Sequence, residues 1–188
     1  MKRIAILVIA GLLSSGCSTV VSSLKEEPIK EDPTDRTTGS FVDDQLIEIK
    51  ANVNISKGSV DLSSSHVNVT SFNGIVLLTG QVPNEASRSE AEQIVSQVRK
   101  IRRIHNELTI TSPTASLARA NDTWITAKIK ANMIGDKGID ATQIKVVTEN
   151  GVVYLMGLVT RDQSDKAIEV VRSVNGIQKI VKIFEYID

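Results

Sequence analysis

An internal repeat constrains the fold of this chain more than any other feature. The segment VNVTSFNGIVLLTGQV (67–82) aligns with IKVVTENGVVYLMGLV (144–159), with Asn-Gly and a later glycine at matching places. Each segment has two β-branched apolar runs joined through Asn-Gly, a pair that tolerates positive φ at both turn positions. We therefore expect one β-hairpin in each copy of the repeat.

The repeat extends on both sides of the hairpins and predicts the other elements. We expect the first helix of each unit to begin at Asp44 and Asp122, because aspartate is a favourable N-cap residue. Each unit then reads helix, strand, strand, helix, strand. This order predicts an α+β fold in which the helices pack on a small mixed sheet. The expected bounds are 86–99 and 162–174 for the second helices, and 103–110 and 179–187 for the last strands.

Capping signals mark the second helices. Thr160 and Gln163 have the spacing of a capping box at the start of the later one. Gly176 suits the C-terminal exit of that helix, because glycine adopts a left-handed backbone without strain. Lys100 occupies the matching place in the first unit, so we expect the same exit there with a less suitable residue.

The first seventeen residues, MKRIAILVIAGLLSSGC, have the pattern of a secretory signal. A basic pair precedes an apolar run that is too short to span a bilayer comfortably, and small residues lead to Cys17. This pattern resembles a bacterial lipoprotein signal, in which the cysteine is acylated, for example with palmitate, and becomes the mature N-terminus. Ser14 stands where such signals usually have leucine, and Ser18 favours the outer membrane. A plain secretory signal with an incidental cysteine is the alternative.

The segment after Cys17 reads as a tether. Residues 18–40 contain two prolines and five acidic residues, with little apolar content and no sustained period. The predicted organisation is a signal peptide over 1–16, the lipidated cysteine and flexible tether over 17–40, a first domain over 41–111, a linker over 112–118 and a second domain over 119–188.

Two tandem units with this order of elements, a hairpin reading NG-(I/V)-V-x-L-x-G and a closing (I/V)-x-x-I strand resemble the BON domain. The whole chain resembles outer-membrane lipoproteins that carry two such domains. The resemblance implies a protein without enzymatic activity or cofactor, anchored in the outer membrane and facing the periplasm. It further implies binding of anionic phospholipid, such as phosphatidylglycerol or cardiolipin, through the second domain, with enrichment at division sites and support of outer-membrane integrity.

The only tryptophan lies in NDTWITAKIKAN (121–132). At about 100° per residue, Ile125, Ile129 and Met133 form a stripe that should face the sheet, and Trp124 lies about 140° from its centre. A second apolar strip that carries Trp and is edged by lysines is typical of an interfacial membrane helix. Packing of this strip on the first domain and an exposed Trp without a function are the alternatives. The predicted phospholipid-binding residues are Trp124, Ala127, Lys128, Lys130, Ala131 and Ile134.

The first unit also has a second apolar strip, formed by Leu46, Ile49 and Val53. It contains no aromatic residue and lies on a more acidic helix, so we expect it to pack against the partner domain. A protein-interaction adaptor is the alternative function. Such an adaptor would dock a cell-envelope partner through the tryptophan helix or through an open sheet face that carries Tyr154 and Met156.

Other chemistry finds little support in the sequence. The two histidines, His66 and His105, belong to different predicted elements, and no metal-ligand cluster or nucleophile motif is present, so we predict structural histidines and no enzyme. The segment IGDKG (134–138) matches a nucleic-acid-binding G-x-x-G loop, but it leads from a helix toward a strand and reads as a helix exit. Without residues 1–16 the chain has 20 basic and 22 acidic residues, which argues against nucleic acid as a partner.

Overall fold

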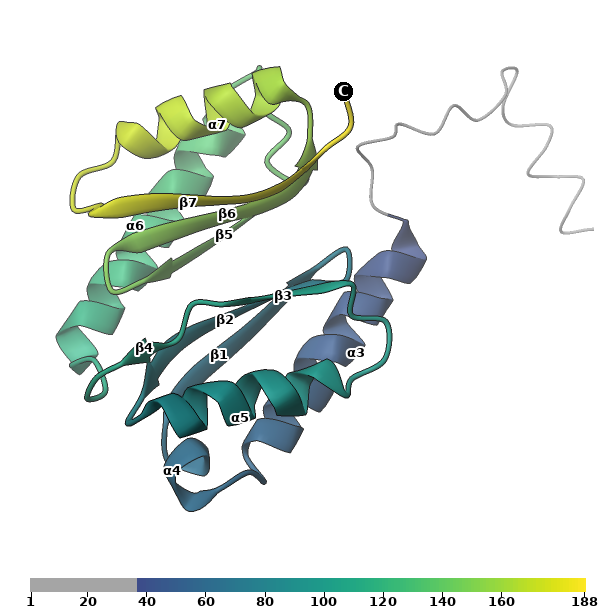
Figure 1. Ribbon diagram of the computed structural model, residues 1–188. Helices are drawn as coiled ribbons and strands as arrows, with labels where there is room; N and C mark the ends of the chain where they lie inside the picture. The colour runs from purple at the N-terminus through teal and green to yellow at the C-terminus, as the bar shows by residue number, and fades with distance from the viewer. Residues whose placement is uncertain (1–36) are drawn as a thin grey trace, which may run out of the picture. The chain divides into compact units, whose positions relative to one another are not determined.

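Both copies of the repeat fold as helix, strand, strand, helix, strand, as the sequence predicts (Figure 1). The computed structural model describes residues 37–188, which belong to one structural unit; Cys17 and the predicted signal lie outside the described residues. The first domain contains α3 (Thr38–Ile55), α4 (Val60–Ser63), β1 (His66–Phe72), β2 (Ile75–Val82), α5 (Glu85–Ser96), β3 (Arg103–Asn106) and β4 (Thr109–Ile110). The second contains α6 (Ser116–Gly135), β5 (Ile144–Glu149), β6 (Val152–Val159), α7 (Arg161–Arg172) and β7 (Lys179–Tyr186).

Each domain is built on a mixed sheet around its hairpin. In the first domain β1 pairs with β2 antiparallel, and β2 pairs with β3 and β4 parallel; in the second, β5 and β6 are antiparallel and β6 and β7 are parallel. The hairpin turns have φ values of 51° and 74° at Asn73 and Gly74, and of 48° and 73° at Asn150 and Gly151. The predicted Asn-Gly turns with positive φ at both positions are therefore confirmed.

One buried carboxylate in each domain ties the first helix to the hairpin. Asp44 accepts hydrogen bonds from the backbone N–H groups of Asn73 (2.7 Å) and Gly74 (2.9 Å). Asp122 accepts the matching bonds from Asn150 (2.7 Å) and Gly151 (2.9 Å). The prediction that these aspartates start the helices was wrong, because both lie within their helices and face the hairpin turn. The helices begin at Thr38 and Ser116, so the end of the segment predicted as a linker, 112–118, is helical.

The second helices agree with prediction at the start of α7 and end earlier than predicted. Thr160 and Gln163 form the predicted capping box at the start of α7. Gly176 has a φ of 89°, and Lys100 adopts a φ of 73° at the matching place, but α7 and α5 end at Arg172 and Ser96, so both residues lie in the turn that follows the C-cap rather than at the helix exit itself. The first domain departs from prediction in two ways: the short helix α4 was not expected, and the predicted strand 103–110 is broken into β3 and β4. The break lies opposite Gly80, where φ is 122°.

Three apolar cores hold the described residues together. Two lie within the domains, where the helices pack on one face of each sheet. The third joins the domains through the other sheet faces, and it comprises Phe72, Ile75, Leu77, Tyr154, Met156 and Ile183. The prediction of an open sheet face that carries Tyr154 and Met156 is therefore wrong, because these side chains are only 5% and 0% exposed. The expectation that Leu46, Ile49 and Val53 pack on the partner domain is also wrong, since these side chains are exposed.

Polar contacts surround this third core. The carboxylate of Glu149 accepts hydrogen bonds from Gln81 Nε2 (2.7 Å) and Asn68 Nδ2 (3.1 Å) across the domain boundary. Further contacts lie along the boundary, among them Lys145 Nζ with Glu48 (2.6 Å), Arg102 with Glu185 (2.6 Å) and Asn73 Nδ2 with Glu185 (2.9 Å). The sheet-to-sheet contact thus has an apolar centre and a satisfied polar border, as protein interfaces do.

Candidate functional site

All six predicted lipid-binding residues lie on α6 and are exposed to solvent. Trp124 is 55% exposed and Ile134 is 76% exposed. The opposite side of the helix carries the stripe of Ile125, Ile129 and Met133, which is at most 1% exposed. The prediction that Trp124 points away from its own domain core is therefore confirmed, and the third core, formed by sheet residues, leaves this side of α6 uncovered.

The exposed apolar strip is longer than the sequence suggested. Because α6 begins at Ser116, it also presents Leu117 and Ala120 to solvent, and Leu117 is 82% exposed. Leu117 precedes Trp124 by seven residues, which places it on the same side of a helix. It escaped prediction because the helix was expected to begin at Asp122. We define the α6 outer face as Leu117, Ala120, Trp124, Ala127, Lys128, Lys130, Ala131 and Ile134.

The charge of α6 is one-sided. Its only carboxylate, Asp122, is buried and bonded to the hairpin turn, whereas Lys128 and Lys130 are exposed. Within residues 37–188, neither lysine takes part in an ion pair. The α6 outer face therefore combines apolar side chains with free positive charge and presents no carboxylate of its own helix.

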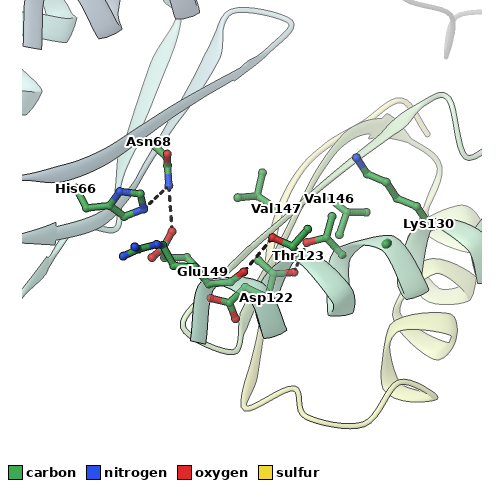
Figure 2. Close-up of a pocket in the computed structure, with 12 residues that line it drawn as sticks. His66, Asn68, Asp122, Thr123, Lys130, Val146, Val147 and Glu149 are labelled. Carbon is green, nitrogen blue, oxygen red and sulfur yellow. Dashed lines mark hydrogen bonds between the residues drawn. The ribbon is translucent and has the colours of Figure 1, made fainter. Parts of the chain in front are cut away.

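A cleft of about 530 Å³ adjoins one edge of this face, between α6, β5 and β1 (Figure 2). Ala127 and Lys130 line it together with residues of the domain boundary. Figure 2 shows His66 and Asn68 directed toward Glu149; Asn68 lies 3.2 Å from His66 Nε2 and 3.1 Å from the Glu149 carboxylate. These polar groups bond to one another, so they have a structural role at the domain boundary.

The histidines and Tyr154 lie on strands outside the α6 outer face. His105 lies on β3 and His66 on β1, and burial, followed by the charge of Arg103, lowers the pKa of His105. Burial raises the pKa of Tyr154 in the third core to about 12, and nearby carboxylates add to the shift. Among the residues that the structure describes, no three His, Cys, Asp or Glu side chains converge as metal ligands.

The end of α6 is a helix exit, as predicted for IGDKG. The helix stops at Gly135, and the side chain of Asp136 accepts a hydrogen bond from the backbone N–H of Gly138 (2.8 Å). Such a local turn is satisfied by its own side chain and needs no bound ligand. In the part of the chain described here, none of the helices has both the length and the apolar character to span a bilayer.

Comparisons with known proteins match both halves of the chain. The family model of the BON domain matches residues 43–112 and 121–187. The outer membrane lipoprotein DolP of Haemophilus influenzae is 35% identical over 189 residues, covering 100% of this chain and 97% of that protein. The 21 kDa hemolysin of Actinobacillus pleuropneumoniae is 34% identical over 152 residues, covering 81% and 78%. The C-terminal domain of CdsD from Chlamydia trachomatis, a solved structure, matches at 13% identity with a TM-score of 0.31, covering 77% of this chain and 67% of that one, which is too distant to bear on function.

Proposed function

Because the chain belongs to the BON-domain family, we propose that it is a non-enzymatic lipoprotein of the outer membrane that binds anionic phospholipid through the α6 outer face. The 35% identity over the full length to a protein named as an outer membrane lipoprotein supports a membrane anchor. We assign the anchor to Cys17. We further propose that the protein faces the periplasm and supports outer-membrane integrity at division sites.

The observation that carries the lipid-binding proposal is the composition of the α6 outer face. Trp124, Leu117 and Ile134 are exposed apolar side chains on a helix whose inner stripe is fully buried. An amphipathic helix with free lysines and a tryptophan suits the headgroup region, where the indole ring is buried and its N–H stays hydrated. The α3 helix also exposes apolar residues, but its strip of Leu46, Ile49 and Val53 contains no aromatic residue.

The expected affinity of the unanchored protein is modest. A Trp side chain presents 150–250 Å² in full, so 55% exposure leaves on the order of 100 Å² to bury, or about 2.5 kcal/mol. Each lysine near an anionic surface adds about 1 kcal/mol. These gains oppose the cost of association. An acyl anchor at Cys17 would raise the local concentration of the membrane to the order of millimolar, where weak binding suffices.

Vesicle flotation of a soluble form, residues 24–188, tests the proposal. Wild type should float with phosphatidylglycerol- or cardiolipin-containing vesicles in a salt-sensitive manner, and not with zwitterionic vesicles. Trp124→Glu removes the indole and adds a repelled charge, so it should weaken binding by at least about 100-fold. Val60→Glu is the matched control, because Val60 is 83% exposed on α4. Imaging the same variants as fluorescent fusions tests the division-site part.

The same assay separates lipid binding from an adaptor function. The sheet face that could have docked a partner is occupied by the third core, so the α6 outer face is the one that remains of the two docking surfaces predicted for an adaptor. If wild type binds neither kind of vesicle, the lipid-binding proposal is wrong. Retained binding of Trp124→Glu to anionic vesicles would instead place the lipid contact elsewhere on the chain.

A further inference from the structure

A second hollow lies at the other end of the domain boundary, between the start of α3 and the end of α6. This groove has a volume of about 280 Å³. Its floor is apolar, since Phe72, Met133 and Ile144 line it and are at most 5% exposed. Its rim includes Phe41 from α3 and Ile134 from α6. The groove is thus shared by the two domains and is continuous with the α6 outer face, to which Ile134 belongs.

Two apolar side chains at the rim of this groove are exposed to solvent, and they stand among polar residues such as Gln45 and Thr142. Phe41 is 48% exposed and Ile134 is 76% exposed, although both border an apolar hollow that could shelter them. Lys130, which also belongs to the α6 outer face, lines the same groove. An apolar floor, an exposed aromatic ring and a free ammonium group at the edge match the acyl chain and the phosphate of an anionic phospholipid.

The acidity of α3 does not oppose this match. Asp43 forms an ion pair with Lys100 (2.7 Å), and Glu48 forms one with Lys145 (2.6 Å). The third carboxylate of the helix, Asp44, is buried at the hairpin turn. Each negative charge of α3 is therefore compensated or turned inward, so this helix contributes little repulsion from an anionic surface.

Chain connectivity also favours a membrane at this place. Phe41 follows Cys17 by only 24 residues, so the start of α3 is the described segment nearest in sequence to the proposed anchor. The other end of α3 is about 25 Å farther along the helix axis. A bilayer that holds Cys17 is thus more accessible to Phe41 than to α4.

We propose that Phe41 enters the same bilayer as Trp124, and that the groove beneath it takes an acyl chain of an anionic phospholipid whose phosphate binds Lys130. The inference rests on the proposed function and extends the lipid contact from the second domain to both. It makes docking depend on the sheet-to-sheet contact, because that contact places the start of α3 beside the end of α6.

Moving the single tryptophan tests the inference. The full chain, purified from membranes, would be reconstituted in phosphatidylglycerol vesicles whose acyl chains carry bromine, which quenches nearby indole fluorescence. In a Trp124→Phe background, Phe41→Trp and Gln45→Trp place the only indole at the groove, and Val60→Trp places it on α4 as the control. Gln45 is exposed, so its substitution disturbs no core if Phe41→Trp proves unstable in urea.

The expected result is strong quenching in wild type and at both groove positions, with little quenching for Val60→Trp. Quenching of wild type, with Phe41→Trp and Gln45→Trp no more quenched than Val60→Trp, would overturn the inference and leave the proposed function standing. Absence of quenching in wild type as well would overturn both, because Trp124 itself would then not reach the acyl chains.

Discussion

The buried carboxylate of Asp122 gives the sharpest test of how the second domain holds α6 in place. Asp122 is 6% exposed and accepts hydrogen bonds from Asn150 N–H and Gly151 N–H. In Asp122→Ala both donors lose their acceptor. Gly151 is buried, so its N–H loses a partner that water cannot replace, whereas the exposed Asn150 can be rehydrated. The helix would also lose its fixed attachment to the hairpin.

The cost can be estimated from these contacts. An unsatisfied buried donor costs about 1–3 kcal/mol, and a lost hydrogen bond to a charged group costs about 1.5–3 kcal/mol before rehydration. We therefore expect Asp122→Ala to lower the free energy of unfolding by about 3 kcal/mol. Asp44→Ala should cost about 4 kcal/mol, because Asp44 also accepts from the buried Ser71 hydroxyl (2.7 Å).

Urea unfolding followed by circular dichroism is the assay. Asp165→Ala, at an exposed position of α7, is the control, and it should change stability by less than about 0.5 kcal/mol. Because alanine has a higher helix propensity than aspartate, all three variants gain from this effect, and comparison with Asp165→Ala corrects for it. Losses below about 1 kcal/mol at both Asp44 and Asp122 would refute the claim that these carboxylates hold the first helix to the hairpin. A larger loss for Asp122→Ala than for Asp44→Ala would refute the claim that the cost follows the number of hydrogen bonds that each carboxylate accepts.

Two further predictions concern the outer face and the domain boundary. Leu117→Ser should weaken the binding of residues 24–188 to anionic vesicles about 10-fold, because it removes about 1.5 kcal/mol of apolar burial in the membrane. Ile110→Ser, at an exposed position of β4, is the control and should leave binding unchanged. If both variants bind equally well, Leu117 does not belong to the lipid contact. At the boundary, burial raises the pKa of Glu185, but hydrogen bonds from Arg102 and Asn73 outweigh burial and hold this pKa below its ordinary 4.5. A lowered pKa adds stability above pH 4.5 that is lost as the pH falls through the folded-state value. In urea titrations from pH 7 to 3, the free energy of unfolding should therefore fall less in Arg102→Gln than in wild type.

The local elements were predictable because their signals are local. Asn-Gly predicts a turn from two adjacent residues, and the capping box of Thr160 and Gln163 needs only four. Asp44 and Asp122 misled prediction for the complementary reason. An aspartate before an apolar period looks like an N-cap, yet its partner lies about 30 residues away at the hairpin turn. Only the match between the two copies hinted at a shared role.

The sheet-to-sheet contact was the main feature that the sequence did not reveal. Strand β2 reads IVLLTGQV and is buried at every position, which is the pattern of a strand covered on both faces. That pattern could have indicated a second buried face, with Leu77 and Met156 directed into it. The strip of Leu46, Ile49 and Val53 instead suggested that helices would join the domains. A chain with two apolar surfaces per domain does not specify from periodicity alone which of them meets the partner.

This choice of surfaces explains why α6 can act outward. The domains meet through the sheet faces that the helices do not cover. The outward sides of α3 and α6 therefore stay out of the apolar contact between the domains, and both helices keep an exposed apolar strip. Their charges then separate them. The two half-buried carboxylates of α3, Asp43 and Glu48, are paired with lysines, whereas α6 has no exposed carboxylate and keeps Lys128 and Lys130 unpaired within the described residues. Two copies of one fold thereby present different surfaces, and the copy that carries Trp124 is the one suited to an anionic bilayer.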